Sequence, residues 1–482
     1  MSKPAVKRRR LAAQRYENRR QDLLTLPQEV VFHVFSFLEA ADLTTCARVS
    51  TKWYEAANDD HLWKPLYLVR FSNPRQLLVQ QLRSQRLHSK LATGSHTAGL
   101  STAATHNIDQ RLNDRRNKWK NLYKVNHNWE TGNCQVDELA LPLKEERLPI
   151  DQTSNETIIQ ICHDMMATTW GGSSYIDIWQ IHGSHIEHIS KAGPSTPTCT
   201  YVTCIKWDTV DTRRVIVGYS NGGFTVYQVD ARERFVQQLA HYEARPSVTC
   251  DRHCVKSITL CDNVVMTCST DMELSTYTFD EQGNTRFCHC LTSAMHWEPL
   301  TIEVYSKGDQ TYQAVVCFGM SVGLDSWTIG LQEIIFTANL ILNSRHSSSR
   351  LPPGHGLLDR IQKISYAHPY VVTSHKNNTM QQYRIITEHG KRIEIEHVRT
   401  LWGHTNSVGA MAMDARIGRL VSGDRAGIKV WNLESPRELV VGIESGFGER
   451  MEWIGFDSEK IVTVAGDHEN NVKVWSFTSS NK

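Results

Sequence analysis

The sequence contains no apolar run long enough to cross a membrane. Its 482 residues are 40% hydrophobic and 22% charged, and no stretch approaches the roughly 18 consecutive apolar residues of a membrane-spanning helix. The basic cluster Lys7–Arg10 near the start is not followed by the apolar core that a secretory signal peptide requires. We therefore expect a soluble protein that is not secreted and does not bind a membrane.

Motifs of the common catalytic sites are also missing. The sequence has no nucleophile elbow, no phosphate-binding glycine-rich loop, no Walker sequence and no HExxH zinc motif. Its 12 cysteines are scattered, several inside apolar runs, as is typical of reduced cysteines in a core. Cys288 and Cys290 would share one face of a strand while His289 points the other way, which is poor geometry for zinc. We therefore expect no enzyme, no metal and no cofactor.

Charge of one sign is concentrated in particular segments, although the net charge of the chain is only +2. Residues 1–20 carry 8 basic and 1 acidic side chains, and residues 69–126 carry 11 and 2. Residues 21–68 carry 3 and 7, which leaves 31 basic and 41 acidic residues, a balance of −10, in 127–482. We interpret residues 1–20 as a disordered basic tail, and a nuclear-import signal remains an alternative.

The apolar residues of segment 21–68 predict a small helical unit with more apolar surface than it can bury. Pro27 suits the first turn of a helix, where its missing N–H costs nothing. In the residues that follow, two neighbouring helical faces are apolar. One carries Val30, Val34 and Phe37, and the other carries Val31, Phe35 and Leu38. Because so short a unit cannot cover so wide an apolar stripe, we expect it to bind a partner.

The order of residues in this segment resembles the F-box. The resemblance rests on Leu26-Pro27, Glu29-Val30, Leu38, Asp42-Leu43, Val49, Trp53 and Leu62-Trp63. F-boxes dock onto the Skp adaptor, through which a cullin and a RING subunit are held. The resemblance implies that the Skp-facing residues are Leu26, Pro27, Val30, Val34, Leu38, Leu43, Val49 and Trp53. Ser50, where many F-boxes have cysteine, is a small departure.

Residues 69–126 predict a helical connector interrupted by a mobile loop near 90–107. Ser, Thr, Ala and Gly dominate that loop, whereas near-helical apolar spacing flanks it. A nucleic-acid surface is one interpretation of the basic charge of this connector. We favour a packed helix with solvated Lys and Arg side chains, because no aromatic residues alternate with the charges to stack on bases.

Residues 127–480 predict an all-β propeller, giving an α+β multidomain protein. Short strands alternate with Gly, Asn, Asp and Ser, and seven strand endings share an aromatic residue at intervals of 44 to 56 residues. These residues are Trp179, Tyr227, Tyr277, Trp327, Tyr383, Trp431 and Trp475. Seven units of this length fit a propeller of four-stranded blades, and residues 129–137 are predicted to close the last blade.

The segment from Leu401 to Leu433 resembles a WD repeat, in which a histidine, a serine, an aspartate and a tryptophan form a structural hydrogen-bond network. The resemblance assigns that network to His404, Ser422, Asp424 and Trp431. The turn that contains Asp424 is one residue shorter than the family pattern. Arg425 in this turn, and more weakly Lys363, are the candidate substrate-binding residues. The charge of −10 favours an unphosphorylated, even basic, target over a phosphorylated one.

Together these resemblances imply an F-box/WD-repeat substrate receptor of a Skp–cullin–F-box ubiquitin ligase. Such a receptor promotes ubiquitination of an unidentified target protein, leading to proteasomal degradation, in the cytoplasm, the nucleus or both. An alternative is an assembly or trafficking scaffold that binds Skp without ligase activity. A third hypothesis, an enzyme on the propeller, is disfavoured because His404, Ser422 and Asp424 are explained by the structural network.

Overall fold

The computed structural model separates the chain into two compact units, residues 1–129 and 130–482. The residues that it describes are 27–71, 118–140, 158–182, 185–194, 200–208, 211–244, 253–293, 296–322, 326–349, 359–388, 392–434, 439–444, 451–465 and 471–478. The predicted tail, Leu26 and the predicted loop near 90–107 lie outside these residues. None of the described helices is long and apolar enough to cross a membrane.

The first unit is built from short helices. They are α2 (Gln28–Phe35), α3 (Ala40–Cys46), α4 (Thr51–Ala57), α5 (Asp60–Phe71) and α8 (Lys118–Thr131). Pro27 immediately precedes α2, and the Ser50 hydroxyl caps α4 by accepting a hydrogen bond from the Trp53 N–H at 3.3 Å. Asp42 lies in the first turn of α3, where its charge favours the helix N-terminus.

One apolar cluster holds these helices together. It contains the buried side chains of Val31, Phe35, Leu43, Ala57, Leu62 and Trp63. The Trp63 indole donates a hydrogen bond to the Ala57 carbonyl at 2.8 Å, which satisfies its only polar atom. On α8, the ring of Tyr123 packs edge-on against Trp63 with 5.4 Å between the ring centroids. The backbone N–H of Trp119, also on α8, donates a hydrogen bond to the Asp60 carboxylate. Segments 27–71 and 118–129 therefore share one core.

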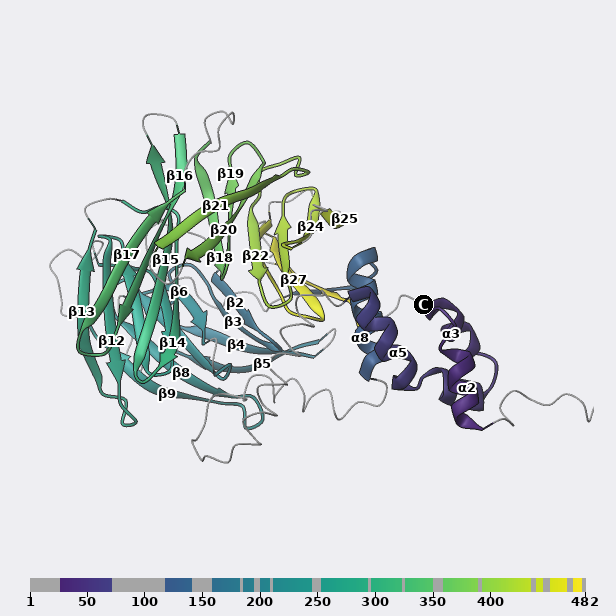
Figure 1. Ribbon diagram of the computed structural model, residues 1–482. Helices are drawn as coiled ribbons and strands as arrows, with labels where there is room; N and C mark the ends of the chain where they lie inside the picture. Colours follow the sequence, from purple (N-terminus) through teal and green to yellow (C-terminus); the bar gives the residue numbers. More distant parts are fainter. Residues whose placement is uncertain are drawn as a thin grey trace, which may run out of the picture. The chain divides into compact units, whose positions relative to one another are not determined.

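The second unit consists of seven four-stranded antiparallel sheets, which are the blades of a propeller (Figure 1). Blade 1 contains β2 (Ile158–Cys162), β3 (Met165–Thr169), β4 (Ile176–His182) and β5 (His185–Ala192). Blade 2 contains β6 (Val202–Trp207), β7 (Arg214–Tyr219), β8 (Phe224–Asp230) and β9 (Phe235–Tyr242). Blade 3 contains β10 (Val255–Cys261), β11 (Val264–Ser269), β12 (Glu273–Phe279) and β13 (Thr285–Thr292). Blades 4 and 5 contain β14 (Leu300–Gly308), β15 (Thr311–Val322), β16 (Ser326–Phe336), β17 (Ile341–Ser348); and β18 (Ile361–Ala367), β19 (Tyr370–His375), β20 (Met380–Glu388), β21 (Arg392–Leu401). Blades 6 and 7 contain β22 (Ala410–Asp414), β23 (Arg419–Gly423), β24 (Gly427–Asn432), β25 (Leu439–Glu444); and β26 (Met451–Phe456), β27 (Lys460–Ala465), β28 (Asn471–Ser476), β1 (Gln135–Ala140).

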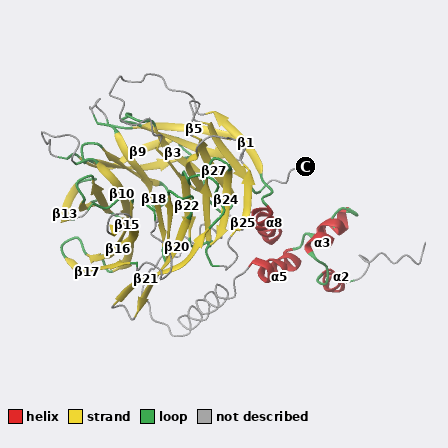
Figure 2. Cartoon of the chain, turned by 90° about the horizontal axis from the view of Figure 1, so that it is seen from above, coloured by secondary structure: helices red, strands yellow, loops and turns green. Residues whose placement is uncertain are grey.

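The blades form a closed ring, seen from above in Figure 2. The first strand of each blade contacts the first strand of the next, and β26 of blade 7 returns to β2 of blade 1. Blade 7 is completed from the other end of the unit, because β1 pairs antiparallel with β28. The closing strand is therefore residues 135–140 rather than the predicted 129–137, since α8 continues to Thr131.

Six of the seven repeated aromatic residues occupy one structural position, opposite the second residue of the neighbouring second strand of their blade. Trp327 does not, because it lies opposite Ser321 near the end of β15, and Phe336 holds the equivalent position in blade 4. Each of the seven lies on the third strand from the centre of its blade, namely β4, β8, β12, β16, β20, β24 and β28. Trp431 and Tyr383 are almost completely buried, at 0% and 1% exposure. Between adjacent blades, alternate side chains form apolar clusters, such as the one joining Ile216 and Phe224 of blade 2 to Val265 and Tyr277 of blade 3. The aromatic period therefore matches the blade period in every blade except the fourth.

Candidate partner-binding surfaces

Helix α2 presents apolar side chains on two faces. Val31 and Phe35 face the core of the helical unit and are 2% and 1% exposed. Val30 and Val34 remain 43% and 40% exposed, and Phe37, just after the helix, is 76% exposed. A contiguous apolar strip of this kind on a small unit is typical of a protein-binding surface. We call Val30, Val34 and Phe37 the α2 face.

The other predicted Skp-facing residues are distributed between the surface and the core. Pro27 and Val49 are exposed, the latter by 63%, whereas Leu38 and Trp53 are half-buried against the apolar cluster. Leu43 is only 1% exposed, so the prediction that its side chain faces a partner is wrong. It lies on the inward face of α3 and acts by holding the core together.

The predicted set of Skp-facing residues omits two exposed aromatic residues of the helical unit, although the sequence places one of them, Phe37, on the same face as Val30 and Val34. Phe37 continues the spacing of Val30 and Val34 by three residues, a signal that was available in the sequence. Tyr54, next to the half-buried Trp53 on α4, is 54% exposed. Nothing in the local pattern separates the inward aromatic residue from the outward one, because the direction of α4 is set by its packing.

In blade 6 the structure brings the four predicted network residues together. The Ser422 hydroxyl lies 2.7 Å from His404 Nε2 and accepts a hydrogen bond from the Trp431 indole at 2.7 Å. His404 Nδ1 lies 3.0 Å from the Asp424 carboxylate. The chain of contacts links the segment before β22 to β23 and β24, so it joins three parts of one blade.

The Asp424 carboxylate is held by several donors at once. It accepts backbone N–H bonds from Thr405 at 3.1 Å, and from Ala426 and Gly427 at 3.0 Å each. Burial raises the pKa of Asp424, but the neighbouring His404 and the backbone N–H groups of Asn406 and Gly427 outweigh it and lower that pKa to about 2. The carboxylate is therefore ionised at neutral pH and stabilises the short turn.

These contacts resemble a Ser-His-Asp triad in distance but not in accessibility. The side chains of His404 and Asp424 are 0% exposed, and Ser422 is also 0% exposed. The Ser422 oxygen already accepts the Trp431 N–H, so one of its two lone pairs is occupied. A nucleophile must reach its substrate within hydrogen-bonding distance of its base. The arrangement links the strands of the blade to one another through buried hydrogen bonds.

The two candidate substrate-binding residues lie in different environments. Arg425 is exposed in the β23–β24 turn, directly after Asp424. Lys363 is half-buried on β18, and its ammonium donates to the Glu452 carbonyl of β26 at 3.4 Å. Since β18 and β26 belong to blades 5 and 7, this contact skips a blade. None of the described interactions joins Arg425 to Lys363.

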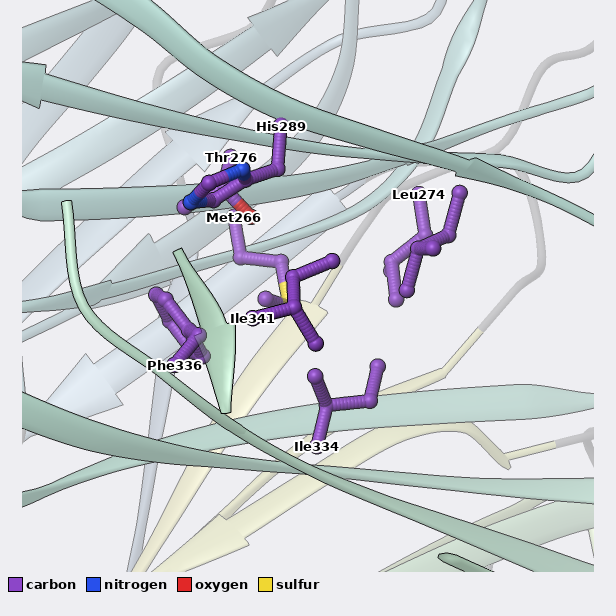
Figure 3. A pocket seen from close by; sticks show the side chains of 8 residues that line it. Met266, Leu274, Thr276, His289, Ile334, Phe336 and Ile341 are labelled. Carbon is purple, nitrogen blue, oxygen red and sulfur yellow. The ribbon is translucent and has the colours of Figure 1, made fainter. Parts of the chain in front are cut away.

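A small pocket opens between blades 3 and 4 (Figure 3). Its walls are Met266, Leu274, Thr276, His289, Leu291, Ile334, Phe336 and Ile341. The one titratable side chain in this lining, His289, already lies 3.0 Å from the Thr337 carbonyl. In the described part of the chain no three His, Cys, Asp or Glu side chains gather as a metal site would need. The pocket is a gap in apolar packing.

Comparisons with known proteins identify both units. Residues 23–69 match the F-box-like family, and residues 134–353 and 357–442 match the family described as F-box protein pof12 beta-propeller.

The curated relatives are F-box proteins. F-box protein pof12 of Schizosaccharomyces pombe is 23% identical over 84% of this chain and 83% of its own length. An F-box protein of Saccharomyces cerevisiae is 30% identical over 23% of this chain and 17% of its own. A probable E3 ubiquitin ligase complex SCF subunit, sconB of Arthroderma benhamiae, is 31% identical over 24% of this chain and 18% of its own. Because the propeller match covers more than half of the 482 residues, the chain belongs to the F-box proteins with a pof12-type β-propeller.

Proposed function

We propose that this protein is the substrate-recognition subunit of a Skp–cullin–F-box ubiquitin ligase. In this proposal the helical unit binds the Skp adaptor, and through it a cullin and a RING subunit, while the propeller binds a target protein. The family match supports the first half, and the relative named as a probable SCF subunit supports the assembly. The setting is the cytoplasm, the nucleus or both.

The α2 face carries the proposal. Val30, Val34 and Phe37 leave apolar surface exposed on an F-box helix whose opposite face is already buried in its own core. Burying such side chains against a partner contributes roughly 25 cal/mol per Å² of apolar surface removed from water. The exposed Val49 of the segment between α3 and α4 adds apolar area to the same unit.

The proposed subunit contributes proximity and no catalytic group of its own. Holding a target beside a conjugating enzyme that carries ubiquitin raises the effective concentration of the target lysines. That role requires a rigid receptor, and the closed ring of seven blades supplies one. The burial of Ser422 and His404 supports a structural rather than a nucleophilic role for them.

The test is co-purification of the Skp adaptor with the full chain carrying Val34→Glu and Phe37→Glu together. An unpaired carboxylate placed in an apolar interface is strongly unfavourable. We expect Skp recovery to fall by about tenfold or more, while circular dichroism and the melting temperature remain as in the wild type. Both positions are exposed, so the core of the helical unit is not altered.

Val69→Glu is the matched control, because Val69 is 87% exposed on α5 of the same unit but lies outside the α2 face. It should leave Skp recovery unchanged. Undiminished Skp recovery with the double variant would contradict the assignment of the α2 face. Recovery of Skp without any cullin from the wild-type chain would instead favour the scaffold alternative.

A further inference from the structure

An exposed tryptophan marks one surface of blades 5 and 6. Trp402 follows the last residue of β21 and is 64% exposed, although it belongs to the best-formed repeat of the propeller. Its neighbours Leu401 and His404 are buried, at 1% and 8% exposure, so the loop itself is anchored. A rigidly held, exposed tryptophan is an uncommon feature and is the residue type most enriched in binding hot spots.

Three segments that are distant in the sequence meet around this residue. Asn378, in the β19–β20 turn, donates a hydrogen bond to the Thr405 carbonyl at 3.1 Å. On the other side, the Thr405 N–H donates to Asp424, which precedes Arg425. Lys429 Cδ lies 3.8 Å from where a Cβ at Gly403 would stand. Residues 376–379, 402–409 and 424–429 therefore form one continuous surface, which we call the Trp402 surface.

The charged side chains of the Trp402 surface are nearly all positive. Lys376 and Arg425 are exposed, and Lys429 is half-buried. Its single carboxylate, Asp424, is 1% exposed and is engaged by His404 and backbone N–H groups. The outward field is thus cationic. The average charge of −10 over residues 127–482 describes the propeller as a whole and not this surface.

We propose that the Trp402 surface binds a segment of a target protein that carries several aspartate or glutamate residues beside an apolar side chain. The proposal rests on the receptor function proposed above. The indole of Trp402 offers a flat apolar contact, and Lys376, Arg425 and Lys429 pair with carboxylates on either side of it. This differs from the basic target that the overall charge favours, because binding depends on the local arrangement of charges.

The spacing of the cations favours carboxylates over a single phosphate. Tight capture of one phosphate uses several Arg side chains that converge on its oxygens as bidentate donors. The Trp402 surface has one Arg and two Lys residues, supplied by two different turns and by β24. Three separated cations match charges distributed along a peptide.

The test uses the full chain, purified with its Skp adaptor, as bait for a displayed library of random peptides. We expect the selected peptides to be enriched in Asp and Glu next to aromatic or aliphatic residues. Trp402→Ala and Arg425→Glu should each weaken binding of a selected synthetic peptide by about tenfold. Binding of that peptide should also weaken as salt is raised, since exposed charges are screened.

Two variants of blade 2 serve as matched controls: Phe235→Ala removes another exposed aromatic residue, and Arg232→Glu reverses another exposed charge. Both should bind the peptide as the wild type does. Selection of basic peptides, of peptides bound only when phosphorylated, or of peptides bound equally by Trp402→Ala would overturn the proposal. So would selection of no peptide at all. Loss of peptide binding with Skp retained would leave the receptor function itself untouched.

Discussion

At the scale of single residues, the blades of this propeller provide a hydrogen-bond acceptor for the buried tryptophan N–H in more than one way. In blade 6 the Trp431 indole donates to Ser422, which is also bound by His404. In blades 1 and 7 the equivalent tryptophans donate to a threonine hydroxyl, as Trp179 does to Thr168 at 2.8 Å. The tryptophan N–H is satisfied in each case, which burial makes obligatory. The histidine of blade 6 is therefore an addition to a simpler pattern.

Removing that histidine tests its structural role. His404→Ala leaves the Asp424 carboxylate and the Ser422 hydroxyl buried with one partner fewer, so we expect a loss of roughly 1–3 kcal/mol of unfolding free energy. Chemical denaturation of the full chain measures it. His188→Ala is the control, because His188 also contacts a blade tryptophan but has a 43% exposed side chain. A cost no larger than that of the control would contradict the network.

The four network residues could be predicted from the sequence because the resemblance specifies their order and spacing. Asp424 was the uncertain member, since its turn is one residue shorter than the family pattern. The short turn still works because the carboxylate binds N–H groups on both sides, those of Thr405 and Gly427. Spacing along the chain carries no information about those backbone donors.

At the scale of helices and strands, periodicity predicted where the elements lie better than it predicted what their side chains pack against. The apolar spacing in α2 predicted both faces of the helix, and the structure buries Val31 while it exposes Val34. The F-box resemblance, in contrast, placed Leu43 on the partner-facing surface, where it does not lie. A leucine on a short helix points inward or outward according to how that helix packs, and seven residues of α3 define no clear period.

The closing strand shows a similar limit of prediction from the sequence. The need for a closed ring predicted that a segment before blade 1 would complete blade 7, and β1 does so. The predicted range 129–137 began too early, because the last helix of the predicted connector 69–126 continues to Thr131. Helix ends depend on local competition between hydrogen bonds, which composition alone does not resolve.

Closure by β1 has a measurable consequence for the stability of the propeller. A chain that begins at residue 132 keeps β1, whereas one that begins at residue 141 lacks it and leaves the β28 edge unpaired. We expect the second chain to melt at a lower temperature and to aggregate more readily, because an exposed strand edge templates pairing with another chain. Equal melting temperatures and equal solubility of the two chains would contradict a closing role for β1.

At the scale of the whole molecule, the sequence predicted the order of the parts and the number of blades, but not the surface that we infer to bind targets. Repetition made the architecture visible, since each of the seven aromatic residues lies on the third strand of its blade, although Trp327 does not hold the same position on that strand as the others. The Trp402 surface draws Lys376 from blade 5 and both Trp402 and Arg425 from the next repeat, and the packing of these adjacent blades brings their segments together. Its positive charge is not apparent from the net charge of the propeller, which is negative.

The division of labour between the two units leads to the last prediction, which concerns the fate of a bound target. A receptor that holds its target through the propeller but has lost the Skp contact of the α2 face should keep the target without having it ubiquitinated. Expression of the Val34→Glu, Phe37→Glu double variant beside the wild type, followed by quantitative proteomics of captured proteins, should therefore show a small set of proteins enriched on the variant. Adding Trp402→Ala to the double variant should release that set, because it removes the inferred apolar anchor of the propeller. Equal capture of the same unmodified proteins by the wild type and by the double variant would contradict a ligase function and favour a scaffold.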